Sequence, residues 1–168
     1  MPAVVVDSSV LITLAAGEQF TLLRELYGTL LVPQEVWNEV TSVAKPYGAG
    51  ECQRAKTESW LIIRNPVKLD AIGALPFNLQ PGETQALGLA LEIPGSLLLV
   101  DDAQGRRAAH FLGIRYTGTL GVLLRAKEEG KLPALRPVLG LMQKRTTFWL
   151  ADEVRKAALA KAGEAEPS

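Results

Sequence analysis

The stretch Val4-Val5-Val6-Asp7-Ser8-Ser9-Val10-Leu11-Ile12 decides the fold. Its three valines predict a buried β-strand, because β-branched residues are enriched in strands. A helix-compatible pattern begins directly afterwards, so Asp7 should stand at the carboxyl end of the strand. In open α/β sheets ligands collect outside those ends, which makes Asp7 a candidate for binding a metal ion or a substrate. Taken alone, however, Asp7 is explained better as a cap for the helix that follows.

Short apolar strands continue to alternate with helices along the chain. Further strands are predicted at 29–32, 60–63, 96–100 and 114–117. Helices are predicted at 8–16, 19–27, 34–43, 51–59, 83–92, 103–112 and 119–129, with a loop at 65–79 and a helical region at 133–163. Apolar strands separated by helices indicate an α/β fold with a parallel sheet of about five strands and helices on both faces.

Length and composition exclude several kinds of protein. The 168 residues fit one domain, which we place at 1–163, with a frayed tail at 164–168. Lys plus Arg and Asp plus Glu both number 18, so the formal net charge is zero. The chain therefore has no excess of basic residues that would indicate a nucleic-acid-binding surface. A single cysteine, Cys52, and a single histidine, His110, rule out an internal disulfide and a multi-histidine zinc site. We expect a cytoplasmic protein without a membrane segment.

Acidic residues occupy four positions that the predicted sheet should bring together. They are Asp7 after the first strand, Glu39 on the helix after the second, Glu83 in the first turn of a helix, and Asp101 and Asp102 after the fourth strand. Carboxylates gathered at one edge repel each other and raise each other's pKa values unless a divalent cation neutralises them. Oxygen ligands without histidine favour Mg²⁺ or Mn²⁺, which can activate water for attack on a phosphodiester.

Each acid also has an explanation without chemistry. Glu83 could simply favour the positive end of its helix, and Asp102 could cap the helix that follows it. Glu39 could belong to a solvated helix face that includes Glu35, four residues earlier. Taken together, these explanations are weaker than a shared site. Helix capping alone gives no reason for all the acids to lie where the carboxyl ends of the strands converge.

Other polar residues could support such a site. Ser9 could orient Asp7 or a metal-bound water, although serine is also common at helix starts. Thr119 follows Gly118 at a predicted helix start, where backbone N–H groups could contact a phosphate, or Gly118 could simply permit a turn. Arg106 and Arg107 are possible contacts for RNA phosphates, although a solvated surface explains this basic pair better.

The histidine and the tryptophans are expected to be structural. His110 lies between Ala109 and Phe111 on a predicted helix and fits a packing role better than a catalytic one. The three tryptophans fit the core or an interface better than base stacking. They are Trp37, Trp60 and Trp149.

Four motifs, in this order and at these intervals, resemble those of a known family. Residues 4–12 resemble its opening Asp, hydroxyl residue and apolar helix, and residues 32–40 resemble its Pro-led helix, in which Glu39 matches the ligand. Residues 82–87 resemble the helix start that carries the third acid, with Glu where many relatives have Asp. Residues 98–102 are similar to the strand before the fourth acid, which is Asp101 or Asp102. The family is that of PIN domains, of the compact kind that includes the VapC-type toxins.

The resemblance implies a three-layer α/β/α sandwich and a Mg²⁺- or Mn²⁺-dependent endoribonuclease that acts on single-stranded RNA. Such proteins are often homodimers paired with an antitoxin protein, so we expect the toxin of a toxin–antitoxin pair. The extended helical tail departs from the compact family pattern. The alternative function is a catalytically weak or inactive PIN scaffold that binds RNA or a protein. A phosphate-handling enzyme on a flavodoxin-like sheet is disfavoured, because no Gly-rich loop follows the first strand.

Overall fold

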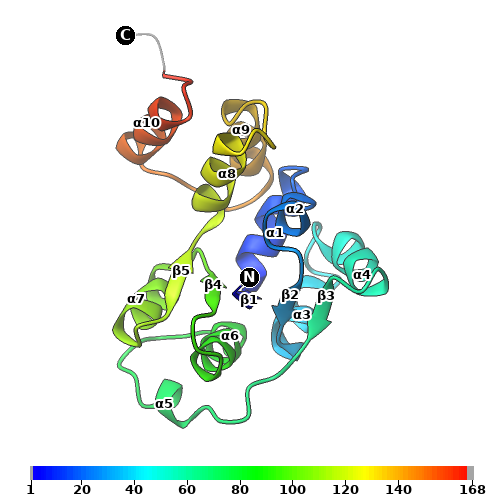
Figure 1. Ribbon diagram of the computed structural model, residues 1–168, viewed down its shortest axis with the longest axis vertical. Coiled ribbons are helices and arrows are strands. Elements are labelled where there is room, and N and C mark those ends of the chain that lie inside the picture. Colours follow the sequence, from blue (N-terminus) through cyan, green and yellow to red (C-terminus); the bar gives the residue numbers. More distant parts are fainter. Residues whose placement is uncertain (1, 166–168) are drawn as a thin grey trace.

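The computed structural model describes residues 2–165, and its centre is a five-stranded parallel sheet (Figure 1). Each strand lies inside a stretch that the sequence predicts as a strand. The strands are β1 (Val4–Val6), β2 (Leu30–Val32), β3 (Leu61–Ile63), β4 (Leu97–Leu99) and β5 (Arg115–Thr117). Helices cover both faces of the sheet, which confirms the predicted three-layer α/β/α sandwich.

The strand order β3-β2-β1-β4-β5 places the first strand at the centre of the sheet. The chain moves outward from β1 through β2 to β3, and then returns to add β4 and β5 on the other side. The order therefore reverses between β1 and β4, where Val6 pairs with Leu99 and the Asp7 N–H donates to the Leu99 carbonyl at 3.0 Å. Such a switch point opens a crevice at the carboxyl ends of the strands.

Ten helices are present in the part of the chain that the structure describes. They are α1 (Ser8–Ala16), α2 (Leu22–Tyr27), α3 (Gln34–Val40), α4 (Ala49–Thr57), α5 (Asp70–Gly73), α6 (Pro81–Glu92), α7 (Ala103–Phe111), α8 (Thr119–Glu128), α9 (Arg136–Arg145) and α10 (Asp152–Lys161). Helices α8, α9 and α10 gather at one end of the molecule, far from α5 (Figure 1).

Two predicted segments differ in the structure. The segment 65–79, predicted as a loop, contains the short helix α5, and the predicted helical region 133–163 is divided into α9 and α10. The division begins at Thr146, whose hydroxyl donates to the Met142 carbonyl at 2.8 Å and accepts from the Phe148 N–H at 3.0 Å. These side-chain hydrogen bonds compete with the helical pattern and end α9.

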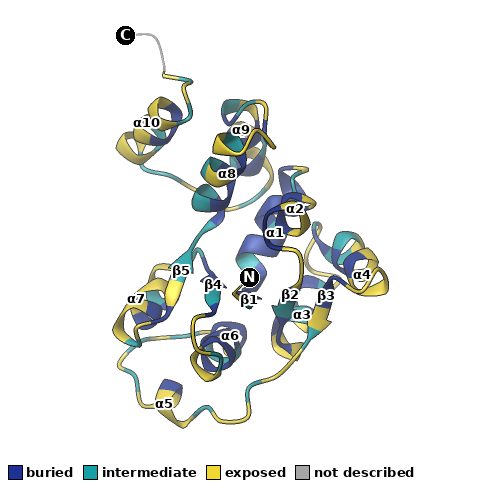
Figure 2. Cartoon of the chain, viewed as in Figure 1, coloured by how far each residue is buried: buried dark blue, intermediate teal, exposed yellow. Residues whose placement is uncertain are grey.

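The core consists of two hydrophobic clusters on opposite faces of the sheet. Successive side chains of a strand point to opposite faces, so Val4 and Val6 join one cluster and Val5 joins the other. The larger cluster holds residues of α1, α2, α8 and α9 and reaches Leu159 of α10, whereas the smaller cluster lies under α6 and α7. Figure 2 shows the buried face of α1 and the mainly exposed outer surface of α10.

The end of the chain is more firmly attached than expected. Residue 164, assigned to the frayed tail, accepts hydrogen bonds from the backbone N–H groups of Leu135 at 2.7 Å and Arg136 at 3.2 Å. Glu164 therefore caps the start of α9, and residues 166–168 of the predicted tail lie outside the described residues. Within residues 2–165, no helix has the length and apolar character needed to cross a membrane.

Candidate active site

Asp7 is buried at the junction of β1 and α1. It stands at the N-cap position of α1, yet its side chain makes no capping hydrogen bond, so capping does not explain it. The residue is only 3% exposed, and its Oδ1 atom has no hydrogen-bond partner among the described residues. A buried oxygen without a hydrogen-bond partner costs free energy, so Asp7 Oδ1 is a candidate to contact a bound metal ion, water or substrate.

Burial raises the pKa of Asp7 to about 7. The backbone N–H of Ser8 opposes the increase in pKa, whereas the negative charges of Glu39, Asp101 and Asp102 add to it. Because these charges act on one carboxylate, the structure brings all three acids into the neighbourhood of Asp7.

Glu39 reaches this region from the half-buried side of α3. Its Oε2 atom accepts a hydrogen bond from the Ser8 hydroxyl at 2.8 Å. The backbone of Gly82 lies against the same atoms, since a Cβ at this glycine would stand 3.3 Å from Glu39 Oε2 and 3.8 Å from Asp7 Oδ1. Asp7 and Glu39 therefore meet across the first turn of α6.

Glu83 uses one oxygen for the helix and leaves the other buried. Its Oε1 atom accepts from the Gln80 N–H at 3.0 Å, which is the capping role that the sequence allowed. Its Oε2 atom is buried without a hydrogen-bond partner among the described residues. Burial raises the pKa of Glu83 well above its usual range, and interaction with Asp102 and the charge of Asp7 raise it further. Capping thus accounts for only part of this side chain.

Asp101 and Asp102 have different hydrogen-bonding roles. Asp102 caps α7, since its Oδ2 accepts from the N–H groups of Gln104 at 2.9 Å and Gly105 at 3.1 Å. Asp101 is held by Thr119, whose N–H donates to Oδ1 at 2.7 Å and whose hydroxyl donates to Oδ2 at 2.6 Å. Burial raises the pKa of Asp101, although these two hydrogen bonds and the charge of Arg106 oppose the increase. Thr119 therefore fixes a carboxylate, whereas the sequence suggested a phosphate contact.

Ser8 and three glycines contact the acids and were not recognised from the sequence. The hydroxyl that orients an acid belongs to Ser8, while the Ser9 hydroxyl is buried without a partner among the described residues. A Cβ at Gly105 would stand 2.7 Å from Glu83 Oε2, and a Cβ at Gly118 would stand 2.6 Å from Asp101 Oδ1. Together with Gly82, these glycines make room for carboxylates at the starts of α6, α7 and α8. Only Gly82 stands next to a predicted acidic residue in the sequence, so Gly105 and Gly118 carried no such signal.

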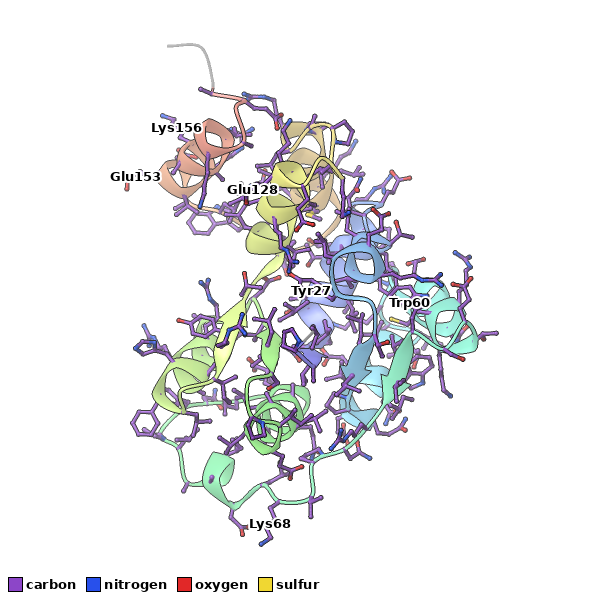
Figure 3. The ribbon with its side chains drawn as sticks, in the orientation of Figure 1. Tyr27, Trp60, Lys68, Glu128, Glu153 and Lys156 are labelled. Atoms are coloured by element: carbon purple, nitrogen blue, oxygen red, sulfur yellow. The ribbon has the colours of Figure 1, made fainter. Side chains whose placement is uncertain are left out.

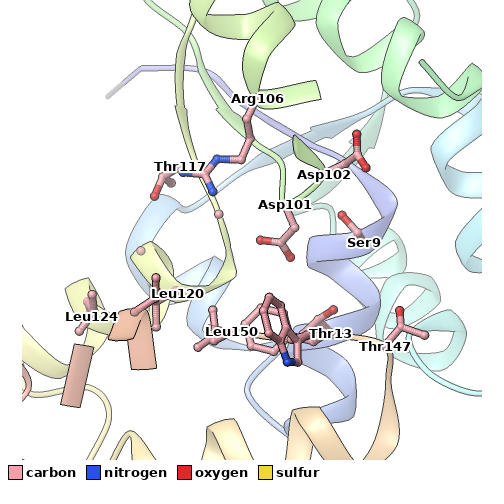
Figure 4. A pocket seen from close by; sticks show the side chains of 15 residues that line it. Ser9, Thr13, Asp101, Asp102, Arg106, Thr117, Leu120, Leu124, Thr147 and Leu150 are labelled. Atoms are coloured by element: carbon pink, nitrogen blue, oxygen red, sulfur yellow. The ribbon is translucent and has the colours of Figure 1, made fainter. Parts of the chain in front are cut away.

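A cleft of about 720 Å³ opens beside Asp101 and Asp102, whereas Asp7, Glu39 and Glu83 are not among its lining residues. Figure 4 shows Asp101 between Arg106 above it and the side chains of Leu120 and Leu150 below it, with Ser9 and Asp102 alongside. Its lining residues are Ser9, Thr13, Asp101, Asp102, Arg106, Thr117, Gly118, Leu120, Gly121, Leu124, Thr147, Phe148, Trp149, Leu150 and Val154. Of the two arginines suggested for phosphate binding, Arg106 lines this cleft, while Arg107 lines a neighbouring surface with His110 and Phe111.

The acids fit a hard divalent cation by their chemistry, but they are not assembled as a complete ligand set. Carboxylate oxygens are the ligands that Mg²⁺ and Mn²⁺ prefer, and Asp7 Oδ1 and Glu83 Oε2 both lack a partner. Across residues 2–165, however, no group of three or more His, Cys, Asp or Glu side chains is arranged so that it could hold a metal ion. Binding of an ion would therefore have to move at least one carboxylate.

The other candidate residues lie away from this arrangement. Burial raises the pKa of the Cys52 thiol to about 12, which does not suit a nucleophile. His110 is exposed on α7 rather than packed in the core. Trp60 is buried near β3 and α4 (Figure 3), and Trp37 is half-buried, but Trp149 is 75% exposed and lines the cleft.

The fold is that of an α/β protein with a parallel sheet, and buried carboxylates lie at its switch point. The sequence matches a family of PIN domains over residues 3–164, and the chain therefore belongs to the PIN-domain family. PIN domains are in general nucleases. None of the curated proteins matches the chain significantly.

Proposed function

We propose that this protein is a Mg²⁺- or Mn²⁺-dependent endoribonuclease that hydrolyses phosphodiester bonds of single-stranded RNA. The observation that carries the proposal is the pair of buried, unpartnered oxygens, Asp7 Oδ1 and Glu83 Oε2, at the edge where β1 and β4 end. Buried carboxylates with raised pKa values are common at functional sites. Membership of a family of nucleases makes metal-assisted hydrolysis the most direct use of such a group.

The acids would act together as ligands of one catalytic cation. Asp7, Glu39, Glu83 and one or both of Asp101 and Asp102 would hold the cation. When bound, the cation would supply an activated water and stabilise the negative charge that develops on the phosphate. Ser8 orients Glu39 and Thr119 holds Asp101, so two of the carboxylates are positioned before any substrate arrives.

The biological setting that we propose is the toxin of a toxin–antitoxin pair, acting as a homodimer and bound by an antitoxin protein. The resemblance of the four acidic motifs to those of VapC-type toxins supports this setting. The proposal predicts that expression of the chain arrests growth and that Asp7→Asn relieves the arrest.

A binding module without catalysis is the second candidate function. The observation that favours it is the absence, within residues 2–165, of three carboxylates arranged as metal ligands. Such a scaffold would bind RNA or a protein and would cleave nothing, whether or not the acids are present.

The test is cleavage of a panel of mixed single-stranded RNAs in Mn²⁺ by the unaltered chain and by single variants. Asp7→Asn and Glu39→Gln should each abolish cleavage, and removal of the metal with EDTA should do the same. Glu35→Gln is the matched control, because Glu35 is an exposed acid on the same helix as Glu39. Comparing Asp101→Asn with Asp102→Asn reports which of the two acids is needed. Cleavage that survives Asp7→Asn would contradict the proposal and exclude this site.

A further inference from the structure

The segment between α9 and α10 supplies one side of the cleft. We call this side the C-terminal wall, and it consists of Thr147, Phe148, Trp149 and Leu150 from that segment together with Val154 in the first turn of α10. It faces a cleft whose other lining includes Asp101, Asp102 and Arg106. A segment near the end of the chain therefore lies next to Asp101 and Asp102, two of the proposed catalytic acids (Figure 4).

Trp149 is exposed in a way that packing does not explain. It is 75% exposed, whereas Trp60 is 7% exposed and packs against Phe20 with 5.6 Å between ring centroids. Neighbouring Val154 is 46% exposed as well. Exposed apolar side chains that line a polar cleft are typical of a binding surface.

The chemistry of the opposite side limits what can bind there. Among the described residues that line the cleft, Arg106 is the only cationic one. It lies close enough to Asp101 for its charge to oppose the rise in pKa that burial causes. The volume of about 720 Å³ falls within the range of about 300–1,000 Å³ that is usual for small-molecule clefts. The cleft therefore contains a flat aromatic ring, a guanidinium and carboxylates. These groups could contact, in the same order, a base of a bound nucleotide, its phosphate, and a metal ion bound next to that phosphate.

We propose that Trp149 stacks on an unpaired base of single-stranded RNA, while Arg106 contacts a neighbouring phosphate. The inference rests on the proposed function and adds how the substrate is held. A base inside a duplex is already stacked on both faces, so only an unpaired base can lie on the indole ring. The C-terminal wall would thus select single strands and place a backbone phosphate near the acids.

The experiment compares Trp149→Phe with Trp149→Leu, because both variants keep an apolar side chain and only the first keeps an aromatic face. Affinity is measured by fluorescence anisotropy with a labelled 12-nucleotide single-stranded RNA in Ca²⁺, with gel analysis to verify that the RNA stays intact. Trp149→Leu should weaken binding roughly 5- to 150-fold, the range expected for loss of one base–aromatic stack. Trp149→Phe should retain most of the affinity, and a duplex of the same sequence should not compete.

Several outcomes would overturn the inference. It falls if the unaltered chain does not bind the RNA, if Trp149→Phe and Trp149→Leu bind equally well, or if duplex competes as strongly as single strand. It also falls if Trp149→Leu alters only the oligomeric state in sedimentation, since the wall would then be an interface between copies. Cleavage in Mn²⁺ is scored separately: loss of cleavage in Asp7→Asn with unchanged RNA affinity in Trp149→Leu would keep the nuclease and reject the stacking.

Discussion

At the scale of single residues, the burial of Asp7 makes the stability of the folded chain depend on pH. Asp7 has a pKa of about 7 in the folded protein, against a reference value of 3.8. Between these two values the folded chain binds more protons than the unfolded chain, so the free energy of unfolding decreases as pH rises. The decrease due to Asp7 is at most about 4 kcal/mol, since each unit of difference in pKa corresponds to about 1.4 kcal/mol.

Asp7→Asn should therefore stabilise the metal-free protein at neutral pH while abolishing cleavage. Urea unfolding in EDTA at pH 5, 6, 7 and 8 should show the variant gaining on the unaltered chain as pH rises. Mn²⁺ at pH 7.5 should raise the unfolding temperature of the unaltered chain more than that of the variant. If the free energy of unfolding depends on pH in the same way for both proteins, the pKa of Asp7 is not raised by folding and the prediction is wrong.

A substitution at Thr119 tests whether the hydrogen bond that holds the Asp101 carboxylate contributes to catalysis. Thr119→Val removes the hydroxyl that donates to Asp101 Oδ2 at 2.6 Å and keeps nearly the same shape. We expect a loss of stability of about 1–3 kcal/mol, because the oxygen is left without its partner, and a fall in kcat of about 10- to 100-fold. Thr119→Ser keeps the hydroxyl and should restore most of both. Equal kcat values for the Val and Ser variants would show that this hydrogen bond does not serve catalysis.

At the scale of elements, the starts of α7 and α8 approach the carboxylates so closely that an added methyl group would overlap them, whereas at the start of α6 the contact would be tight. Gly105→Ala would place a Cβ 2.7 Å from Glu83 Oε2 and 2.9 Å from Val100 Cγ2, and Val100 is buried in the smaller cluster. We expect a loss of about 1–3 kcal/mol in stability, together with weaker cleavage, because Glu83 must move.

Gly140→Ala is the matched control for this substitution. Nothing lies within 4 Å of a Cβ at Gly140, which is inside α9. Alanine there should stabilise the protein by about 0.5–1 kcal/mol through helix propensity alone and leave cleavage unchanged. Thermal unfolding and RNA cleavage of both variants decide the comparison, and a Gly105→Ala variant as stable and active as the unaltered chain would contradict it.

The sequence predicts whole elements better than it predicts contacts between them. All five strands and the helices on both faces of the sheet follow from local patterns, because a β-branched run such as Val4–Val6 between turn or helix signals favours a buried strand. The acidic positions follow from the strand ends and from the family resemblance. The glycine contacts and the exposure of Trp149 did not follow, because both depend on how distant elements pack. The division of α9 from α10 depends on one hydroxyl pattern at Thr146 that helix propensity alone does not reveal.

At the scale of the whole molecule, the end of the chain returns to the body and holds the C-terminal wall in place. Leu159 of α10 is fully buried in the larger cluster, while Glu153 and Lys156 point away from α8 (Figure 3). Glu164 completes the attachment, because it caps α9 and lies 3.4 Å from the ammonium group of Lys127 on α8. Four of the five wall residues lie between α9 and α10 and Val154 lies on α10, so the wall is held by two helices that are both fixed to the rest of the protein.

Glu164→Gln should therefore weaken both the fold and the binding of RNA. Both carboxylate oxygens accept backbone N–H groups, from Leu135 and Arg136, and an amide can accept at only one of those positions. We expect a loss of about 1–3 kcal/mol in stability, since one donor is left unpaired and the charge is lost. A loosened α10 should raise the KM for single-stranded RNA and leave kcat nearly unchanged, because the acids are not touched. Glu129→Gln is the control, since Glu129 pairs with Arg125 at the surface and should change stability by less than about 1 kcal/mol. A less stable Glu164→Gln variant with an unchanged KM would show that the cleft does not depend on the attachment of α10.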